Sequence, residues 1–211
     1  MKAAPILRVD PAALRGLVHA MIRAGGSAED EAAMVTDHLL ESNLQGHDSH
    51  GIMLLVRYVE NLRAGKLNAG VMPEAVRQEP SLAVFDGKMG YGQRIGRITM
   101  DWAINAARQH GHAVMALRNV HHLGRIGSYG EQAARAGMIS VHFVNGVSGP
   151  GAVAPFGGSD GRMSTNPVCV AVPATAEGEH PLILDFATAA IALGKCRVAF
   201  NAGKPVPNGA L

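Results

Sequence analysis

The chain has 211 residues, of which 47% are hydrophobic and only 17% are charged. This composition can bury a sizeable core and excludes an intrinsically disordered chain. The formal net charge is only +2, and the absence of clustered Lys and Arg argues against a nucleic-acid or membrane-surface partner. No apolar run is long enough to span a membrane, and residues 1–5 lack the apolar core of a signal peptide. Two isolated cysteines are typical of reduced core thiols, so we expect a cytoplasmic protein.

The first part of the chain predicts a unit of three helices over residues 10–65. Asp10 followed by Pro11 is typical of a helix start, because aspartate accepts hydrogen bonds from free amides and proline has no amide to satisfy. Apolar residues then recur at helical spacing up to a Gly-Gly pair that ends the first helix. Two further periodic stretches, 27–45 and 51–64, predict the second and third helices.

From residue 82 onward, short apolar runs alternate with stretches of helical spacing. The runs predict strands at 82–86, 113–117, 138–144, 168–172 and 182–184, and the periodic stretches predict helices at 93–109, 128–136 and 187–198. Residues 68–73 contain Asn, Gly and Pro and predict a loop. The pattern favours a mixed α/β (α+β) fold, with a helical domain over residues 1–75 and an α/β domain over residues 76–211.

The polar stretch between the second and third predicted helices contains His50, the most informative residue of the chain. Histidine is the usual side chain that gives and takes a proton near neutral pH. We therefore interpret His50 as a catalytic acid/base. The local sequence leaves an alternative open, in which Asp48 and Ser49 cap the following helix and His50 lies on its surface.

Further polar side chains follow two predicted strands: His121 and His122 after one, and Asp185 after another. With Ser49 and His50 they supply an acid, a hydroxyl and a carboxylate, which together can transfer protons. Capping explains the same residues, because the two histidines can bond to backbone and Asp185 can cap the helix predicted at 187. We interpret five other histidines as surface or helix-end residues: His19, His38, His110, His112 and His180.

Two other classes of function remain open at this point. The side chains of His47, His50, His121, His122 and Asp185 offer enough ligands for zinc, and hence for metal-dependent hydrolysis. The HExxH signature is absent, however, and we expect no metal. A helical interaction module would explain residues 10–65 but not the glycine and histidine clusters that follow. Neither phosphate-binding glycine motif, GxGxxG or GxxxxGK[ST], occurs in the chain.

Five short motifs follow one another along the chain: Asp48-Ser49-His50-Gly51-Ile52, Arg118-Asn119-x-His121-His122-x-Gly124, Ala154-Pro155-Phe156-Gly157-Gly158, Thr165-Asn166-Pro167 and Leu184-Asp185-Phe186-Ala187-Thr188. In this order they resemble the type 2 malate/L-lactate dehydrogenase family, over about residues 10–207. The resemblance implies an oxidoreductase that uses NAD or NADP without a Rossmann fold, in agreement with the missing GxGxxG. It also implies a homodimer with its active site near the subunit interface.

The resemblance also implies roles for individual residues. His50 matches the proton donor to the substrate carbonyl or imine, with Ser49 and Asp185 as its relay partners. His122 matches a histidine with an acid/base role in some members and cofactor contacts in others. Cofactor contacts are implied at His122, Leu123, Gly124, Asn145, Asp185, Phe186 and Ala187, and Thr165 falls near the substrate. The chemistry is consistent, because an imidazolium stabilises the oxyanion that develops at C2 during reduction and supplies its proton.

Two features depart from the family pattern. Many members have an arginine that grips a substrate carboxylate where this chain has Leu54, so we expect Arg57 or another cation to replace it. Family chains are also considerably longer, so we expect an N-terminal partial chain. The sequence predicts an NAD(P)-dependent oxidoreductase for a 2-hydroxy acid/2-oxo acid pair such as malate or lactate. The alternative is an inactive truncated relative that acts as a binding or dimerisation module.

Overall fold

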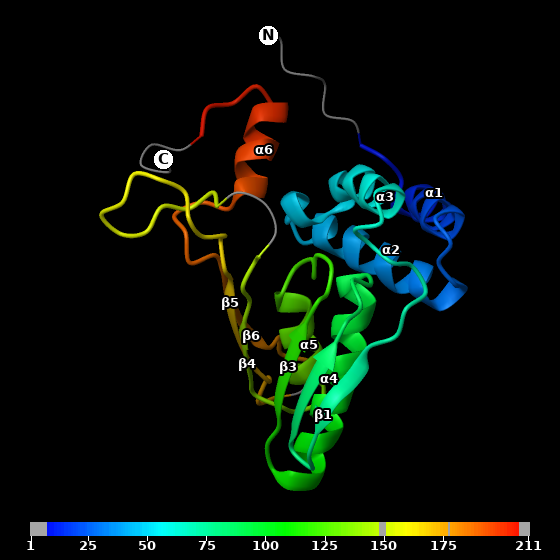
Figure 1. The fold of residues 1–211 in the computed structure, drawn as a ribbon, viewed down its shortest axis with the longest axis vertical. Helices are drawn as coiled ribbons and strands as arrows, with labels where there is room; N and C mark the ends of the chain where they lie inside the picture. The colour runs from blue at the N-terminus through cyan, green and yellow to red at the C-terminus, as the bar shows by residue number, and fades with distance from the viewer. Residues whose placement is uncertain (1–7, 148–150, 177, 207–211) are drawn as a thin grey trace.

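The computed structural model describes residues 8–147, 151–176 and 178–206 (Figure 1). The N-terminal segment 1–5 lies outside these ranges. The fold is mixed α/β, as predicted, with helices α1–α3 gathered at one end and two small sheets extending away from them. This arrangement brings the polar segments of the helical end close to the loops that follow the strands.

The helical end consists of α1 (Pro11–Ala24), α2 (Glu29–Leu44) and α3 (Leu55–Arg63). Asp10 caps α1 as predicted, since its carboxylate accepts hydrogen bonds from the amides of Ala12 and Ala13. The core of this part is formed by apolar side chains of the three helices together with Leu67 and Tyr91. Leu54 is buried in this core, so it cannot replace the arginine that grips a carboxylate in many relatives.

The third helix begins later than predicted, because residues 48–54 form two short 3₁₀ turns, η1 (Asp48–His50) and η2 (Ile52–Leu54). The side chain of Asn43 holds this joint. Its amide donates to Asp48 Oδ1 at 2.6 Å, and its Oδ1 accepts the Ile52 amide at 2.8 Å. A Cβ on Gly51 would lie 2.0 Å from Asn43 Oδ1, so only glycine allows this close approach.

The first sheet has the order β1–β2–β3, with β1 (Glu74–Gln78) antiparallel and β3 (Val114–Arg118) parallel to β2 (Leu82–Asp86). Helix α4 (Gly92–His110) connects β2 to β3 and packs on this sheet. The sequence does not predict β1. All five of its residues are exposed, so this edge strand has no buried face and no alternating pattern.

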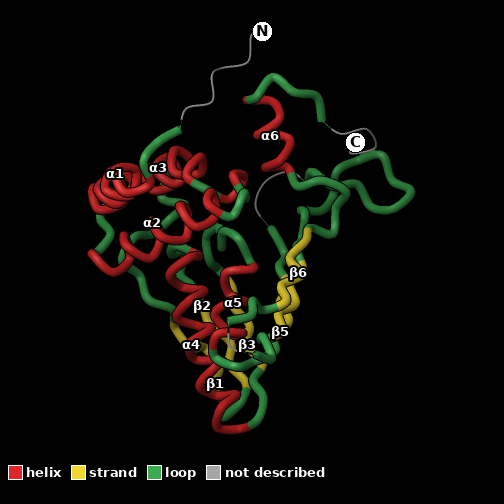
Figure 2. The backbone as a smooth tube through the Cα atoms, turned by 180° about the vertical axis from the view of Figure 1, so that it is seen from behind, coloured by secondary structure: helices red, strands yellow, loops and turns green. Residues whose placement is uncertain are grey.

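The second sheet is antiparallel and consists of β4 (Ser140–Phe143), β5 (Val168–Val172) and β6 (Leu182–Phe186). Helix α5 (Gly127–Arg135) packs on this sheet and on α4, and Figure 2 shows the two helices side by side. Gly130 makes the close packing possible, because a Cβ there would lie 2.9 Å from the Ala171 Cβ. The helix predicted at 187–198 is α6 (Leu193–Asn201), since the strand continues through Phe186 and Asp185 does not cap it.

A buried ion pair ties the helical end to α4. Glu31 of α2 is fully buried, and its Oε1 lies 3.5 Å from Nη1 of Arg94, which is also buried. Arg94 Nη2 donates to Asp30 at 2.7 Å, and Glu31 Oε2 accepts the Gly70 amide at 2.8 Å. Neither charge can exchange its partner for water, so the placement of α2 against α4 is strongly constrained.

Replacing Arg94 by Met should therefore destabilise the protein strongly, because the Glu31 carboxylate would stay buried without a counter-charge. We expect the free energy of unfolding to fall by about 3–5 kcal/mol in urea titrations of the full-length protein. The control is Arg77→Met, which removes an arginine from the exposed Arg77–Glu79 pair and should cost no more than about 0.5 kcal/mol. Equal losses in the two variants would show that the buried Glu31 carboxylate does not depend on Arg94 for its counter-charge.

Candidate active site

The site begins at the joint between α2 and α3, where η1 holds Ser49 and His50 together. The Ser49 hydroxyl lies 3.0 Å from Nδ1 of His50, so one ring nitrogen of His50 is engaged and Nε2 is left for another partner. Ser49 is buried under the start of α6, where a Cβ on Gly194 would lie 2.7 Å from the Ser49 Cβ. His50 is partly buried and is not a first-turn surface residue of a helix.

His122, in the loop between β3 and α5, lies against His50. The two imidazole rings are stacked, with centroids 5.7 Å apart and an interplanar angle of 18°. On its other side, His122 Nδ1 is 2.9 Å from the hydroxyl of Tyr58 on α3. His121 points elsewhere, since its Nε2 is 2.8 Å from the Asn61 amide nitrogen. The structure therefore brings together two of the predicted site residues that lie far apart in the sequence.

Asp185 belongs to β6 and caps a helix other than the one predicted. Its Oδ2 accepts the amide of Gly127 at 2.6 Å, at the N-terminus of α5. A carboxylate is favoured there, because the first amides of a helix are unpaired and the helix dipole is positive at that end. The contact between β6 and α5 spans 58 positions, which explains why a local capping rule assigns Asp185 to the wrong helix.

Some groups around His50 lower its pKa and one raises it. Burial lowers the pKa of His50, and the positive charges near it, at His47, Arg125 and Lys195, lower it further. The carboxylate of Asp185 acts in the opposite direction and raises the pKa of His50. Asp185 is thus close enough to favour the imidazolium form of His50, which is what a relay partner requires.

A second layer of polar residues behind the site is not predicted from the sequence. His38 of α2 accepts the Arg125 backbone amide at 2.9 Å and packs on Tyr129, so its interpretation as a surface residue is wrong. Burial lowers the pKa of His38 to about 4, and Arg125 and His50 contribute. The guanidinium of Arg125 is buried and donates to Glu131 at 2.7 Å. The only sequence signal for this burial is that His38 lies three residues after Val35, close to the apolar face of the predicted helix.

The other predicted site residues differ in their exposure and contacts. Asn145 and Phe186 are exposed, whereas Leu123 is partly buried and packs against a second core cluster. Ala187 is also partly buried. Gly124 is buried with φ of 77°, and a Cβ there would lie 2.3 Å from the His38 ring. The carbonyl oxygen of Thr165 accepts the Thr188 amide.

The structure does not bring every predicted residue to the histidine pair. Arg57 is exposed on α3, and its charge reaches His121 and His122, since it lowers the pKa of both. No hydrogen bond of the described residues joins Thr165, Asn145 or Arg57 to His50 or His122. Within the described ranges, no group of three or more His, Cys, Asp or Glu residues is arranged to hold a metal ion.

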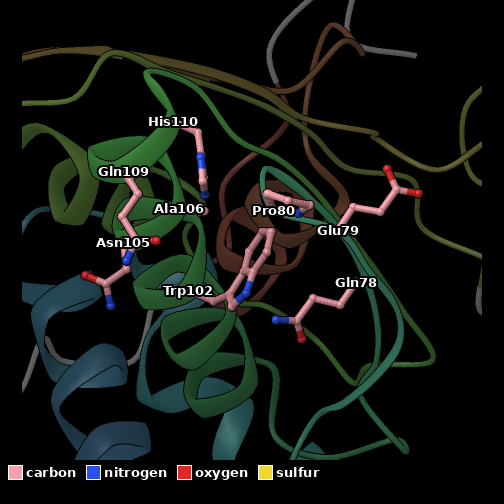
Figure 3. A pocket seen from close by; sticks show the side chains of 8 residues that line it. All are labelled: Gln78, Glu79, Pro80, Trp102, Asn105, Ala106, Gln109 and His110. Atoms are coloured by element: carbon pink, nitrogen blue, oxygen red, sulfur yellow. The ribbon is translucent and has the colours of Figure 1, made fainter.

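A cavity of about 520 Å³ lies apart from this site, between the β1–β2 turn and the C-terminal half of α4. Figure 3 shows its lining, with Trp102 on α4 facing Pro80 of the turn and the Glu79 side chain pointing away. None of its lining residues is a predicted site residue. Trp102 packs edge-on against Phe85, so its place there is explained by the core of the first sheet.

The fold and the site together define a class: a mixed α/β chain in which two histidines, a hydroxyl and a carboxylate are assembled from three separate segments. The model of the malate/L-lactate dehydrogenase family matches residues 9–211, and the chain belongs to this family. None of the helices in the described part of the chain has the length and hydropathy needed to span a membrane.

Curated relatives and solved structures agree with this assignment. The chain is 45% identical over 204 residues to hydroxycarboxylate dehydrogenase B of Escherichia coli K12, covering 97% of this chain and 56% of the relative. It is 40% identical to an L-lactate dehydrogenase of Cupriavidus necator, covering 97% and 58%. A malate dehydrogenase structure from Entamoeba histolytica superposes with a TM-score of 0.88 at 29% identity, covering 95% and 55%. The chain therefore spans little more than half the length of these proteins.

Replacing Asp185 by Asn should lower the pKa of His50, because the substitution removes the negative charge that favours the imidazolium but keeps an oxygen to accept the Gly127 amide. We expect a decrease in the His50 pKa, measured by NMR titration of the His50 ring protons. Asp160→Asn, which removes an exposed carboxylate paired with Arg162, serves as the control. An unchanged His50 pKa in Asp185→Asn would show that this carboxylate does not act on His50.

Proposed function

We propose that the full-length protein interconverts a 2-oxo acid and a 2-hydroxy acid of the malate or lactate type with NAD or NADP, and that His50 carries the proton. The observation that supports this most strongly is the pair of stacked rings, His50 and His122, with the Ser49 hydroxyl on His50 Nδ1. The names of the relatives, hydroxycarboxylate, lactate and malate dehydrogenases, support the same class of substrate.

The proton path follows from the contacts of His50. Since Ser49 holds Nδ1, the proton for the substrate would leave from Nε2, which has no partner among the described residues. A lowered pKa makes the imidazolium a stronger acid, and Asp185 limits this decrease so that the charged form stays accessible. In the direction of oxidation the same nitrogen, unprotonated, would accept the proton of the substrate hydroxyl.

The predicted cofactor residues include side chains of types that suit a nicotinamide cofactor. An exposed aromatic side chain, Phe186, an exposed amide, Asn145, and the imidazole of His122 offer an apolar surface and hydrogen-bonding groups suited to a nicotinamide ring and its carboxamide. The bound cofactor would supply or accept the hydride at C2. Gly124 and Asp185 are occupied by contacts within the protein, so we propose that they shape the site and do not bind the cofactor through their side chains.

The substrate carboxylate needs a cation, and we propose Arg57 for this role. It lies on α3 one residue before Tyr58, is exposed, and takes part in no ion pair within the described residues. A guanidinium can bind a carboxylate with two parallel hydrogen bonds, whereas the buried Leu54 offers none. We also propose Thr165 as a substrate contact and a homodimer as the working assembly, both of which follow from the family resemblance.

Replacing His50 by Ala should abolish turnover while the cofactor still binds. In the full-length protein we expect kcat for the reduction of a 2-oxo acid to fall by about 10²- to 10⁴-fold, the range typical of a lost general acid. NAD(P)H oxidation measures the rate, and fluorescence titration of NAD(P)H measures binding. The control is His112→Ala, an exposed histidine near Ser81.

Near-normal turnover in His50→Ala would show that His50 is not the proton donor. A wild-type protein that fails to bind NAD(P)H would contradict the proposed function as a whole and favour a binding or dimerisation module.

A further inference from the structure

A chain of hydrogen bonds runs behind His122, and the proposed proton path does not use it. The side-chain nitrogen of Gln93, on α4, donates to the Tyr58 hydroxyl at 2.6 Å. That hydroxyl lies 2.9 Å from Nδ1 of His122, and the backbone amide of Gly124 donates to the same nitrogen at 3.3 Å. Tyr58 and Gln93 are 1% and 2% exposed, so water cannot replace either partner.

The direction of every bond in this chain follows from one backbone group. A peptide N–H can only donate, so the Gly124 amide requires Nδ1 of His122 to be an unprotonated acceptor. The Tyr58 hydroxyl must then donate its proton to the same nitrogen, and its oxygen is free to accept from Gln93. With Nδ1 unprotonated, the ring proton of neutral His122 is on Nε2.

We propose that Tyr58 and Gln93 are positioning residues that hold His122 as the neutral tautomer with its proton on Nε2. His122 then presents a fixed hydrogen-bond donor to the oxygen that gains charge during reduction, while His50 alone changes its charge. This assignment rests on the proposed function, because the oxygen in question belongs to the 2-oxo acid.

The surroundings of His122 support a ring that stays neutral. A second proton would have to enter at Nδ1, where it would displace two donors at once. Packing around the ring lowers the pKa of His122, although the residue as a whole is exposed, so the two donors at Nδ1 carry more weight here than burial. The charged or titratable groups that face it are His50, His121, Arg57 and His38, and each of them opposes a positive charge there. Burial raises the pKa of the Tyr58 phenol, so its proton remains available for donation.

The loop geometry keeps the Gly124 amide in place. Gly124 has φ of 77°, and a Cβ would lie 2.3 Å from Nε2 of His38, so both the backbone and the available space require glycine. A Cβ on Gly92, at the start of α4, would lie 2.4 Å from the His122 carbonyl oxygen. The backbone on both sides of His122 is therefore fixed against α2 and α4.

The test is ¹⁵N NMR of the full-length protein labelled at histidine, which distinguishes a protonated from an unprotonated ring nitrogen. In the wild type we expect unprotonated Nδ1 and protonated Nε2 at His122, unchanged from about pH 5 to about pH 9. In Tyr58→Phe we expect a mixture of tautomers and a higher His122 pKa, with kcat/KM reduced about tenfold or more. Gln93→Met, which keeps the Tyr58 hydroxyl, should change the tautomer in the same direction but less.

The matched control is Tyr91→Phe. It removes a hydroxyl from another tyrosine of the same core, which lies edge-on to Tyr58. No hydrogen bond or ring contact of the described residues joins Tyr91 to His122, so the substitution should leave the His122 tautomer unchanged. Protonated Nδ1 in the wild type, or an unchanged tautomer in both Tyr58→Phe and Gln93→Met, would overturn the proposal. Because the NMR spectrum reports the tautomer whether or not the protein oxidises NAD(P)H, a failure of the proposed function would be seen separately.

Discussion

The candidate active site depends on the fixed placement of the N-terminal helices against α4 and the β3–α5 loop. His50 is on the helical side of this contact and His122 is on the other, and no sequence-local structure connects them. The buried pair of Glu31 and Arg94 lies at the contact. An ion pair without access to water tolerates little displacement, because separating the charges leaves each of them without solvation. Such a pair specifies geometry more than it adds stability.

The histidines of the site differ in whether their surroundings favour the neutral or the charged ring, although they lie within one small region. His38 and His122 accept hydrogen bonds from backbone amides, and the packing and positive charges around each ring lower its pKa and favour the neutral form. His50 instead accepts no backbone amide within the described residues, and Asp185 favours its charged form. Because His50 and His122 have different hydrogen-bond partners, His50 can carry the proton while His122 donates a fixed hydrogen bond. The lowered pKa values of the neutral rings also keep competing positive charges away from the substrate.

Much of the fold can be predicted from the sequence, because periodic apolar residues and caps are local signals. The cap at Asp10 and the helices up to α5 are confirmed. The failures have a common cause, since they concern features set by contacts between distant segments. The edge strand β1 is exposed on every residue and leaves no pattern, and Asp185 caps α5 across 58 positions. The 3₁₀ turns at 48–54 depend on the Asn43 side chain, which capping rules do not cover.

The site itself can be predicted only in part. The sequence indicates His50, Ser49, His122 and Asp185 because polar residues at the ends of elements are conspicuous. Tyr58 cannot be recognised in the same way, since it lies on the apolar face of α3 and looks like a core residue.

The pH dependence of kcat/KM for the reduction of a 2-oxo acid by the full-length protein tests the central claim most directly. This parameter reports the titration of the free enzyme and can be compared with the His50 pKa measured by NMR on the same protein. We predict that kcat/KM falls as the pH rises through the His50 pKa, which lies below the ordinary value for histidine, because the proton donor is then lost. A profile that stays flat across the His50 titration, or that follows another group, would contradict the assignment of His50 as the proton donor.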